Sequence, residues 1–210
     1  MSNGVIIHNV LLCLNFFGEV LEMYKAFLKR VIDVVLSLGG ITVLLLPMLI
    51  IAVAIKIDSK GPVLFKQKRV GKDKKYFYIL KFRTMMTETP PDVPTDELSD
   101  PERWVTRVGR FLRMTSLDEL PQLFNILAGH MSVIGPRPAL WNQVDLIEER
   151  DKYGANGIRP GLSGWAQVNG RDKLNSIEKA RLDGEYVKRL GFAFDVKCVL
   201  KTLKCIFTQN

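Results

Sequence analysis

Two neighbouring carboxylates, Asp118 and Glu119, stand just before a proline in the stretch S-L-D-E-L-P-Q. A structural explanation is a capping box, in which Ser116 and Glu119 close the start of a helix. A chemical explanation starts the helix near Asp118, which places Pro121 in the first turn and Asp118 at or near the N-cap. Because a helix N-terminus also attracts anions, an ionised Asp there can attack phosphorus and form an acyl phosphate.

Two carboxylates that face a phosphorylated substrate would repel it. A divalent cation would neutralise this charge, and Mg²⁺ is a natural choice for oxygen ligands, with Asp118 and Glu119 as its candidate ligands. Arg113 lies five residues before the pair, and G-P-R-P holds Arg137 between two prolines that restrict its backbone. Both arginines are candidates for binding phosphate.

A second candidate binding segment is R-P-G-L-S-G-W-A-Q-V-N-G-R, residues 159–171. It contains an unusual density of glycines together with polar and aromatic residues, and such loops more often bind a ligand than merely connect two elements. We therefore add Arg159, Gln167 and Arg171 to the candidate substrate-binding residues.

The charge of the chain is concentrated in one segment. Residues 56–83 contain ten Lys or Arg against two Asp, which equals the net charge of +8 for the whole chain. Such a block suits nucleic acid, an anionic membrane or a phosphorylated substrate. Residues 34–55, just before it, contain no charge and are long enough to cross a bilayer, which favours the membrane over nucleic acid. The three cysteines show no spacing typical of a zinc site.

The apolar segment can span the bilayer or enter and leave it on one side. Lys and Arg flank the segment at both ends, whereas a spanning helix should carry them mainly on its cytoplasmic flank. Pro47 lies near its middle and removes one backbone hydrogen bond. Both arrangements remain open, and the flanking charges favour a re-entrant helix-break-helix. Residues 1–22 are either an extra interfacial helix or an extension that precedes a true start at Met23.

The remaining sequence predicts a hairpin and two amphipathic helices. V-L-F-K-Q-K-R-V-G and Y-F-Y-I-L-K-F-R-T-M read as short strands joined by a turn. From Pro101 onward, arginines and apolar residues alternate at helical spacing, and the lysines of residues 192–207 lie opposite an apolar stripe. This stripe fits either a protein core or the membrane interface.

Several common catalytic patterns are missing. The sequence has no G-x-x-x-x-G-K-[ST], no G-x-G-x-x-G after a strand, no H-E-x-x-H, and only His8 and His130 for a triad. Two alternatives to an enzyme remain: a basic membrane adaptor that acts through residues 56–83, and a nucleic-acid binder supported by charge alone.

Five motifs carry a resemblance to a known family. In order, they are K-R-V-I-D, K-F-R-T-M, S-L-D-E-L-P-Q-L-F-N-I-L, M-S-V-I-G-P-R-P and R-P-G-L-S-G-W-A-Q-V-N-G-R. With the proline-broken apolar segment between the first two, they resemble the bacterial sugar transferase family, the monotopic polyprenyl-phosphate phosphoglycosyl transferases. The resemblance covers nearly everything after Met23 and points to the minimal catalytic form.

The resemblance implies an enzyme on the cytoplasmic face of the bacterial membrane that moves a phosphosugar from a UDP-sugar to polyprenyl (undecaprenyl) phosphate. By the family pattern, Asp118 matches the nucleophile and Glu119 its partner, associated with Mg²⁺ and proton handling. Arg113, Arg137 and Gln167 match phosphate and nucleotide positions. Lys29, Arg30 and Pro47 match the re-entrant anchor that draws the lipid substrate to the interface. A homodimer is compatible with this assignment, and nucleic acid is not an expected partner.

We therefore predict an α+β fold that is mainly helical. Residues 1–22 form an N-terminal extension, residues 23–57 the re-entrant membrane helix-break-helix, and residues 58–210 a small cytoplasmic catalytic domain. That domain is expected to contain the short β-hairpin and amphipathic interfacial helices.

Overall fold

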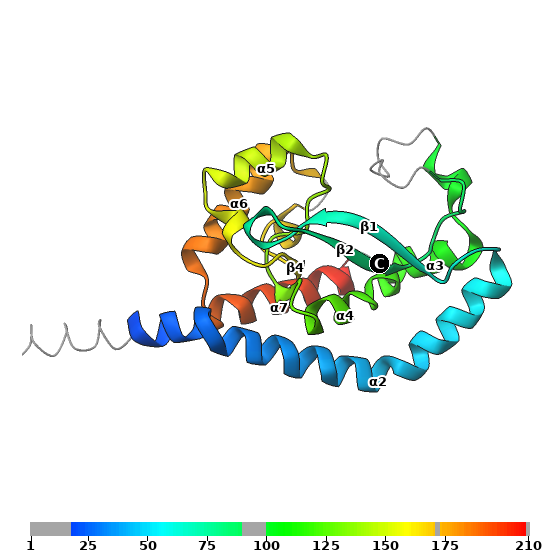
Figure 1. Cartoon of the computed structure of the whole chain (residues 1–210), viewed down its shortest axis with the longest axis horizontal. Helices are drawn as coiled ribbons and strands as arrows, with labels where there is room; N and C mark the ends of the chain where they lie inside the picture. Colours follow the sequence, from blue (N-terminus) through cyan, green and yellow to red (C-terminus); the bar gives the residue numbers. More distant parts are fainter. Residues whose placement is uncertain (1–17, 90–99, 171–172, 209–210) are drawn as a thin grey trace, which may run out of the picture.

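The computed structural model describes residues 18–89, 100–170 and 173–208 (Figure 1). This part of the chain is mainly helical and contains the predicted hairpin, and it also has a second small sheet that was not predicted. One long helix runs along one side of the remaining elements, which we call the body. Arg171 and most of the predicted N-terminal extension lie outside the described residues. The helices are α2 (Lys29–Asp58), α3 (Arg107–Thr115), α4 (Gln122–Leu127), α5 (Val144–Asp151), α6 (Ser176–Arg189) and α7 (Phe192–Thr208). The strands are β1 (Leu64–Val70), β2 (Tyr76–Phe82), β3 (Ser132–Ile134) and β4 (Gly161–Ser163).

The long helix α2 continues through Pro47 without interruption. The expected break between two helices is therefore wrong, and Figure 1 shows a curved helix instead. A proline removes one backbone hydrogen bond and bends a helix, but packing on either side can keep the helix intact. Met48 and Ile55, which follow the proline, are both buried against the body. The placement of α2 in a membrane stays a prediction.

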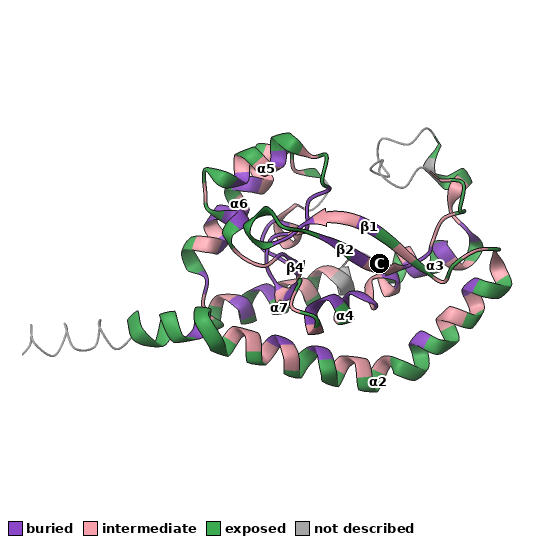
Figure 2. Ribbon diagram, viewed as in Figure 1, coloured by how far each residue is buried: buried purple, intermediate pink, exposed green. Residues whose placement is uncertain are grey.

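The outward face of α2 is apolar. The helical stretch Gly18–Asp58, which contains α2, is the one helix in the described part of the chain that is long and apolar enough to cross a membrane, and only 11% of its most apolar window is buried. Figure 2 shows exposed residues along the edge of α2 that faces away from the body. An exposed apolar surface of this extent is typical of contact with a membrane or a partner.

Strands β1 and β2 form the predicted hairpin. They pair antiparallel, with Lys66 opposite Leu80 and Phe65 opposite Lys81. Because side chains alternate along a strand, Phe77, Ile79 and Lys81 share the inner face of β2. Phe77 and Ile79 are buried there, so the hairpin carries Lys81 toward the interior of the body.

The second sheet is a short parallel pair, for which the sequence shows no local pattern. Ser132 of β3 pairs with Gly161 of β4, and Ile134 pairs with Ser163. A Cβ atom at Gly161 would lie 2.1 Å from the backbone nitrogen of Gly135, so glycine is required for this close approach. Part of the glycine density in residues 159–171 therefore serves backbone packing.

The two amphipathic helices are present, with one changed boundary. Helix α3 begins at Arg107 after the cap residue Thr106, whose side chain accepts a hydrogen bond from the Gly109 backbone N–H. The preceding residues Pro101–Trp104 form a separate 3₁₀ turn. Helix α7 exposes its apolar stripe, so this stripe is not part of the protein core. Its exposed members are Phe192, Val196, Val199, Leu200 and Leu203.

A buried cluster links α2 to the segment that contains the two carboxylates. Its buried members are Met48 and Ile55 of α2, Phe82 of β2 and Leu112 of α3. Leu117 and Leu120, which flank the carboxylate pair, pack against it and are partly buried. The position of Asp118 and Glu119 is thus set by the packing of α2, α3 and the hairpin.

Candidate active site

Asp118 and Glu119 lie in a 3₁₀ turn, Leu117–Glu119, between α3 and α4. Helix α4 begins only at Gln122, and its N-cap is Pro121, without a side-chain cap. Both sequence explanations for this boundary, the Ser116 capping box and Asp118 as N-cap, are therefore wrong. Proline favours positions where no N–H is needed, which explains why the helix starts after Pro121. The pair must be held by side chains rather than by a helix end.

Cations from two other segments hold the pair. Nζ of Lys81 lies 2.7 Å from Oε1 of Glu119 and 3.7 Å from Oδ2 of Asp118. Nη2 of Arg137 lies 3.3 Å from the same Glu119 oxygen. Arg137 was predicted for the site, whereas Lys81 was missed. The sequence did contain a signal for Lys81. Side chains alternate along a strand, so Lys81 lies on the same face as the apolar residues two and four positions before it.

The two carboxylates differ in their pKa. Burial raises the pKa of Asp118 above its ordinary value, although Lys81 acts in the opposite direction. Burial would also raise the pKa of Glu119, but Lys81 and Arg137 together outweigh it and lower this pKa to about 2. Glu119 is therefore a fixed negative charge, and Asp118 is the less stabilised anion. Adjacent carboxyl groups with divergent pKa values are typical of functional sites.

The segment G-P-R-P is fixed to the hairpin by Arg69. Nη1 of Arg69 donates a hydrogen bond of 2.9 Å to the carbonyl of Pro138, and the Val70 backbone N–H donates to the carbonyl of Ala139. Burial, followed by the charge of Arg137, lowers the pKa of Arg69 to about 10. Two arginines and Lys81 thus concentrate positive charge around Glu119, as binding of a phosphorylated ligand requires.

Of the other predicted binding residues, one lies near the carboxylate pair and two make contacts elsewhere. Arg113 lies close enough to Asp118 to lower the pKa of that carboxyl group. Nε of Arg159 donates to the carbonyl of Gly129, and Nε2 of Gln167 donates to the carbonyl of Leu162. In the part of the chain that the structure describes, the ion pairs of Glu119 come from Lys81 and Arg137. Arg159 and Gln167 are instead held by backbone carbonyl groups away from the pair.

The predicted anchor residues Lys29 and Arg30 fasten α2 to the body. Nζ of Lys29 lies 2.6 Å from Oδ2 of Asp195 in α7, and Arg30 donates to two carbonyls at the end of α4. One turn on, the carboxylate of Asp33 accepts a hydrogen bond from the backbone N–H of Val133 in β3. The motif K-R-V-I-D therefore has polar partners within the protein at three of its five positions, and its Ile32 packs against a buried cluster.

The protein supplies only some of the ligands that a magnesium ion needs. In the residues that the structure describes, no group of three or more His, Cys, Asp or Glu side chains is placed to hold a metal. Mg²⁺ commonly binds through one or two carboxylates together with substrate phosphates and water. Asp118 and Glu119 match this arrangement, with the remaining ligands left to the substrate.

Comparisons with known proteins identify relatives. A family model described as bacterial sugar transferase matches residues 24–209. A UDP-glucose:undecaprenyl-phosphate glucose-1-phosphate transferase of Caulobacter vibrioides is 43% identical over 191 residues, which cover 87% of this chain and 70% of the relative. A protein of the same name from Escherichia coli is 42% identical over 184 residues, 84% of this chain and 39% of the relative.

A third relative is named for a different sugar. The UDP-N-acetylgalactosamine-undecaprenyl-phosphate N-acetylgalactosaminephosphotransferase of Aeromonas hydrophila is 39% identical over 188 residues, 87% of this chain and 44% of the relative. The chain thus spans less than half the length of the Escherichia coli and Aeromonas proteins.

Proposed function

Because the chain belongs to the bacterial sugar transferase family, we propose that it transfers a phosphosugar from a UDP-sugar to undecaprenyl phosphate and releases UMP. The observation that carries this proposal is the pair of the buried Asp118 and the partly buried Glu119, held among cations next to the apolar cluster that links the pair to α2. Such a site brings a water-soluble diphosphate and a lipid phosphate together. The names of the relatives support this substrate class.

In the first step, an oxygen of Asp118 attacks the phosphorus that carries the sugar. A bond forms between the carboxylate and phosphorus, the bond to the bridging oxygen breaks, and UMP leaves with that oxygen. In the second step, a phosphate oxygen of the lipid attacks the same phosphorus and restores the carboxylate of Asp118. One phosphoanhydride bond replaces another, so the reaction needs no separate energy source.

The neighbouring side chains have distinct roles in this scheme. Lys81, Arg113 and Arg137 stabilise negative charge on the phosphates as it shifts during transfer. Glu119 is ionised at neutral pH because its pKa is about 2, so it serves to position Lys81 and Arg137 and not as a proton donor. A bound Mg²⁺, held by Asp118 and Glu119, would neutralise charge on the diphosphate.

We propose that α2 lies within one leaflet, at the cytoplasmic face where the nucleotide sugar is available. Its first residue, Lys29, is paired with Asp195 of the body. At its last residue, the Asp58 carboxylate accepts a hydrogen bond from the backbone N–H of Val108 in α3. Since both ends are fastened to one body, a path across the bilayer would require these contacts to break.

The catalytic proposal is tested with Asp118→Asn and a panel of UDP-sugars, including UDP-glucose and UDP-N-acetylgalactosamine. The wild-type protein with Mg²⁺ should release UMP from one of these donors and carry a phosphosugar on the peptide that contains Asp118, as seen by mass spectrometry. Asp118→Asn should lose both signals. The matched control is Asp145→Asn, because Asp145 is an exposed acid on α5. Normal turnover by Asp118→Asn would refute the assignment of the nucleophile.

A further inference from the structure

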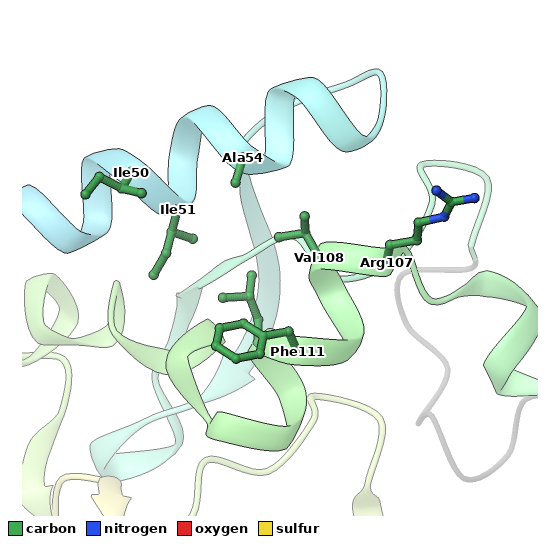
Figure 3. Close-up of a pocket in the computed structure, with 7 residues that line it drawn as sticks. Ile50, Ile51, Ala54, Arg107, Val108 and Phe111 are labelled. Carbon is green, nitrogen blue, oxygen red and sulfur yellow. The ribbon is translucent and has the colours of Figure 1, made fainter.

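An apolar hollow of about 430 Å³ lies between the second half of α2 and helix α3 (Figure 3). Ile51 and Ala54 point from α2 toward α3, and Val108 points back toward them. The guanidinium group of Arg107 points away from the hollow. A ligand in the hollow would therefore contact mainly hydrocarbon side chains. The lining residues are Ile50, Ile51, Ala54, Arg107, Val108, Phe111 and Leu112.

The hollow is close to the carboxylate pair. Leu112, which lines it, belongs to the same apolar cluster as Leu117 and Leu120 on either side of the pair. From Val108 to the end of α3 the helix advances by about 10 Å, at 1.5 Å per residue. Phe111 and Met114 are exposed along this distance, at 57% and 78%. Phe111 also lines the hollow, and Met114 follows it one turn closer in sequence to the turn that contains Asp118. We call these two exposed residues the apolar track.

The hollow also opens onto the apolar face of α2. Ile50, which lines it, is 62% exposed, and the neighbouring Leu49 and Val53 are exposed as well. With α2 in the membrane as proposed, a hydrocarbon chain in the bilayer reaches the hollow without crossing water. This access and the track along α3 are the two properties that a chain attached to a reacting phosphate requires.

We infer that this hollow binds the isoprenoid chain of the polyprenyl phosphate acceptor, a few isoprene units from its phosphate. The inference rests on the proposed function, because it places the phosphate of the same molecule at Asp118. A phospholipid acyl chain would fit the hollow by chemistry, but nothing would tie such a chain to the carboxylate pair. The continuity of the apolar track with the pair therefore favours the acceptor.

The test compares Ala54→Phe, which fills the hollow, with Val53→Phe on the neighbouring outward face. For Ala54→Phe we expect the KM for undecaprenyl phosphate to rise about tenfold. With Val53→Phe it should stay within about twofold of the wild-type value. With geranyl phosphate, whose chain is too short to fill the hollow, Ala54→Phe and wild type should have similar KM values. UMP release from the donor alone should be unchanged in both variants. Equal effects of the two substitutions on the long acceptor would overturn the inference.

If Ala54→Phe fails to fold, photolabelling of the wild-type chain still tests the inference. A polyprenyl phosphate with a photoreactive group on its third isoprene unit should label peptides that contain residues 50–54 and 107–112. Excess phospholipid should leave this labelling in place. Labelling elsewhere, or equal labelling of these peptides by a photoreactive phospholipid, would overturn the inference. Absence of UMP release by the wild type would instead count against the proposed function.

Discussion

The ammonium group of Lys81 lies 2.7 Å from a carboxylate oxygen of Glu119 and 3.7 Å from a carboxylate oxygen of Asp118. One side chain from the hairpin therefore contacts both members of the acidic pair. The alternation of side chains along β2 therefore places a positive charge at the carboxylate pair, and substitution of Lys81 tests its effect.

We expect Lys81→Met to reduce the rate of UMP release by about 100-fold, because one preorganised positive group near a reacting phosphate is worth roughly this factor. The pKa of Asp118 should also rise further, since Lys81 now lowers it. Stopped-flow or quenched-flow measurement of UMP would report the change. Lys66→Met is the matched control, because Lys66 is an exposed lysine on the partner strand. Comparable losses in both variants would show that the effect is not specific to the site.

The pKa of Glu119 predicts a pH-dependent stability. In the folded chain this pKa is about 2, below its ordinary value near 4.5. The ionised carboxylate therefore stabilises the fold above about pH 4.5, and this contribution is lost as the pH falls toward 2. A shift of this size corresponds to a contribution on the order of 3 kcal/mol.

Thermal unfolding in detergent with EDTA measures this contribution. Wild type should be more stable than Glu119→Gln at pH 7, and the difference between their unfolding temperatures should shrink as the pH is lowered below 4. A difference that stays constant down to pH 3 would mean that the carboxylate does not have the low pKa assigned to it.

A third prediction concerns the attachment of α2. Lys29→Met leaves the buried carboxylate of Asp195 without its ion pair, and loss of one partner of a buried pair typically costs about 3 kcal/mol or more. Lys25→Met removes an exposed pair with Glu22 and should cost less than about 0.5 kcal/mol. Denaturant unfolding of both variants in detergent gives the comparison. If Lys29→Met weakens binding of the lipid acceptor without loss of stability, Lys29 binds lipid instead of fastening the helix.

The fourth prediction separates a one-leaflet helix from a spanning one. Lys25→Cys and Lys60→Cys, each in a chain without its native cysteines, place thiols beyond the two ends of α2 at exposed positions. In sealed vesicles, both thiols should react with a membrane-impermeant maleimide from the same side. Reaction from opposite sides would show that α2 crosses the bilayer.

The parts of the fold that follow a local pattern could be predicted from the sequence. Alternating side chains identified the hairpin, and helical spacing identified α7, because these periods depend only on neighbouring residues. The parallel pair of β3 and β4 has three residues in each strand, and its close approach depends on glycines 26 residues apart in sequence, Gly135 and Gly161. A repeat of apolar residues along one short segment cannot predict a pairing between two such distant segments.

The site was predicted in part for the same reason. Asp118, Glu119 and Arg137 stand in distinctive local sequences, and the structure brings all three together. Which of several basic residues faces the pair is decided by tertiary packing. Lys81 reaches the pair from the hairpin, whereas the guanidinium group of Arg159 is engaged by the carbonyl of Gly129. The unbroken course of α2 through Pro47 likewise depends on contacts with the body.

The attachment of α2 at both ends has a consequence for how the protein responds to its lipid environment. A spanning helix must match its hydrophobic length to the thickness of the whole bilayer, and mismatch costs free energy for every ångström. In the proposed arrangement α2 contacts only one monolayer. The length of the lipid acyl chains in the opposite monolayer therefore does not affect its position. Reconstitution into lipids of increasing acyl length should therefore leave the height of Asp118 above the hydrocarbon boundary nearly constant.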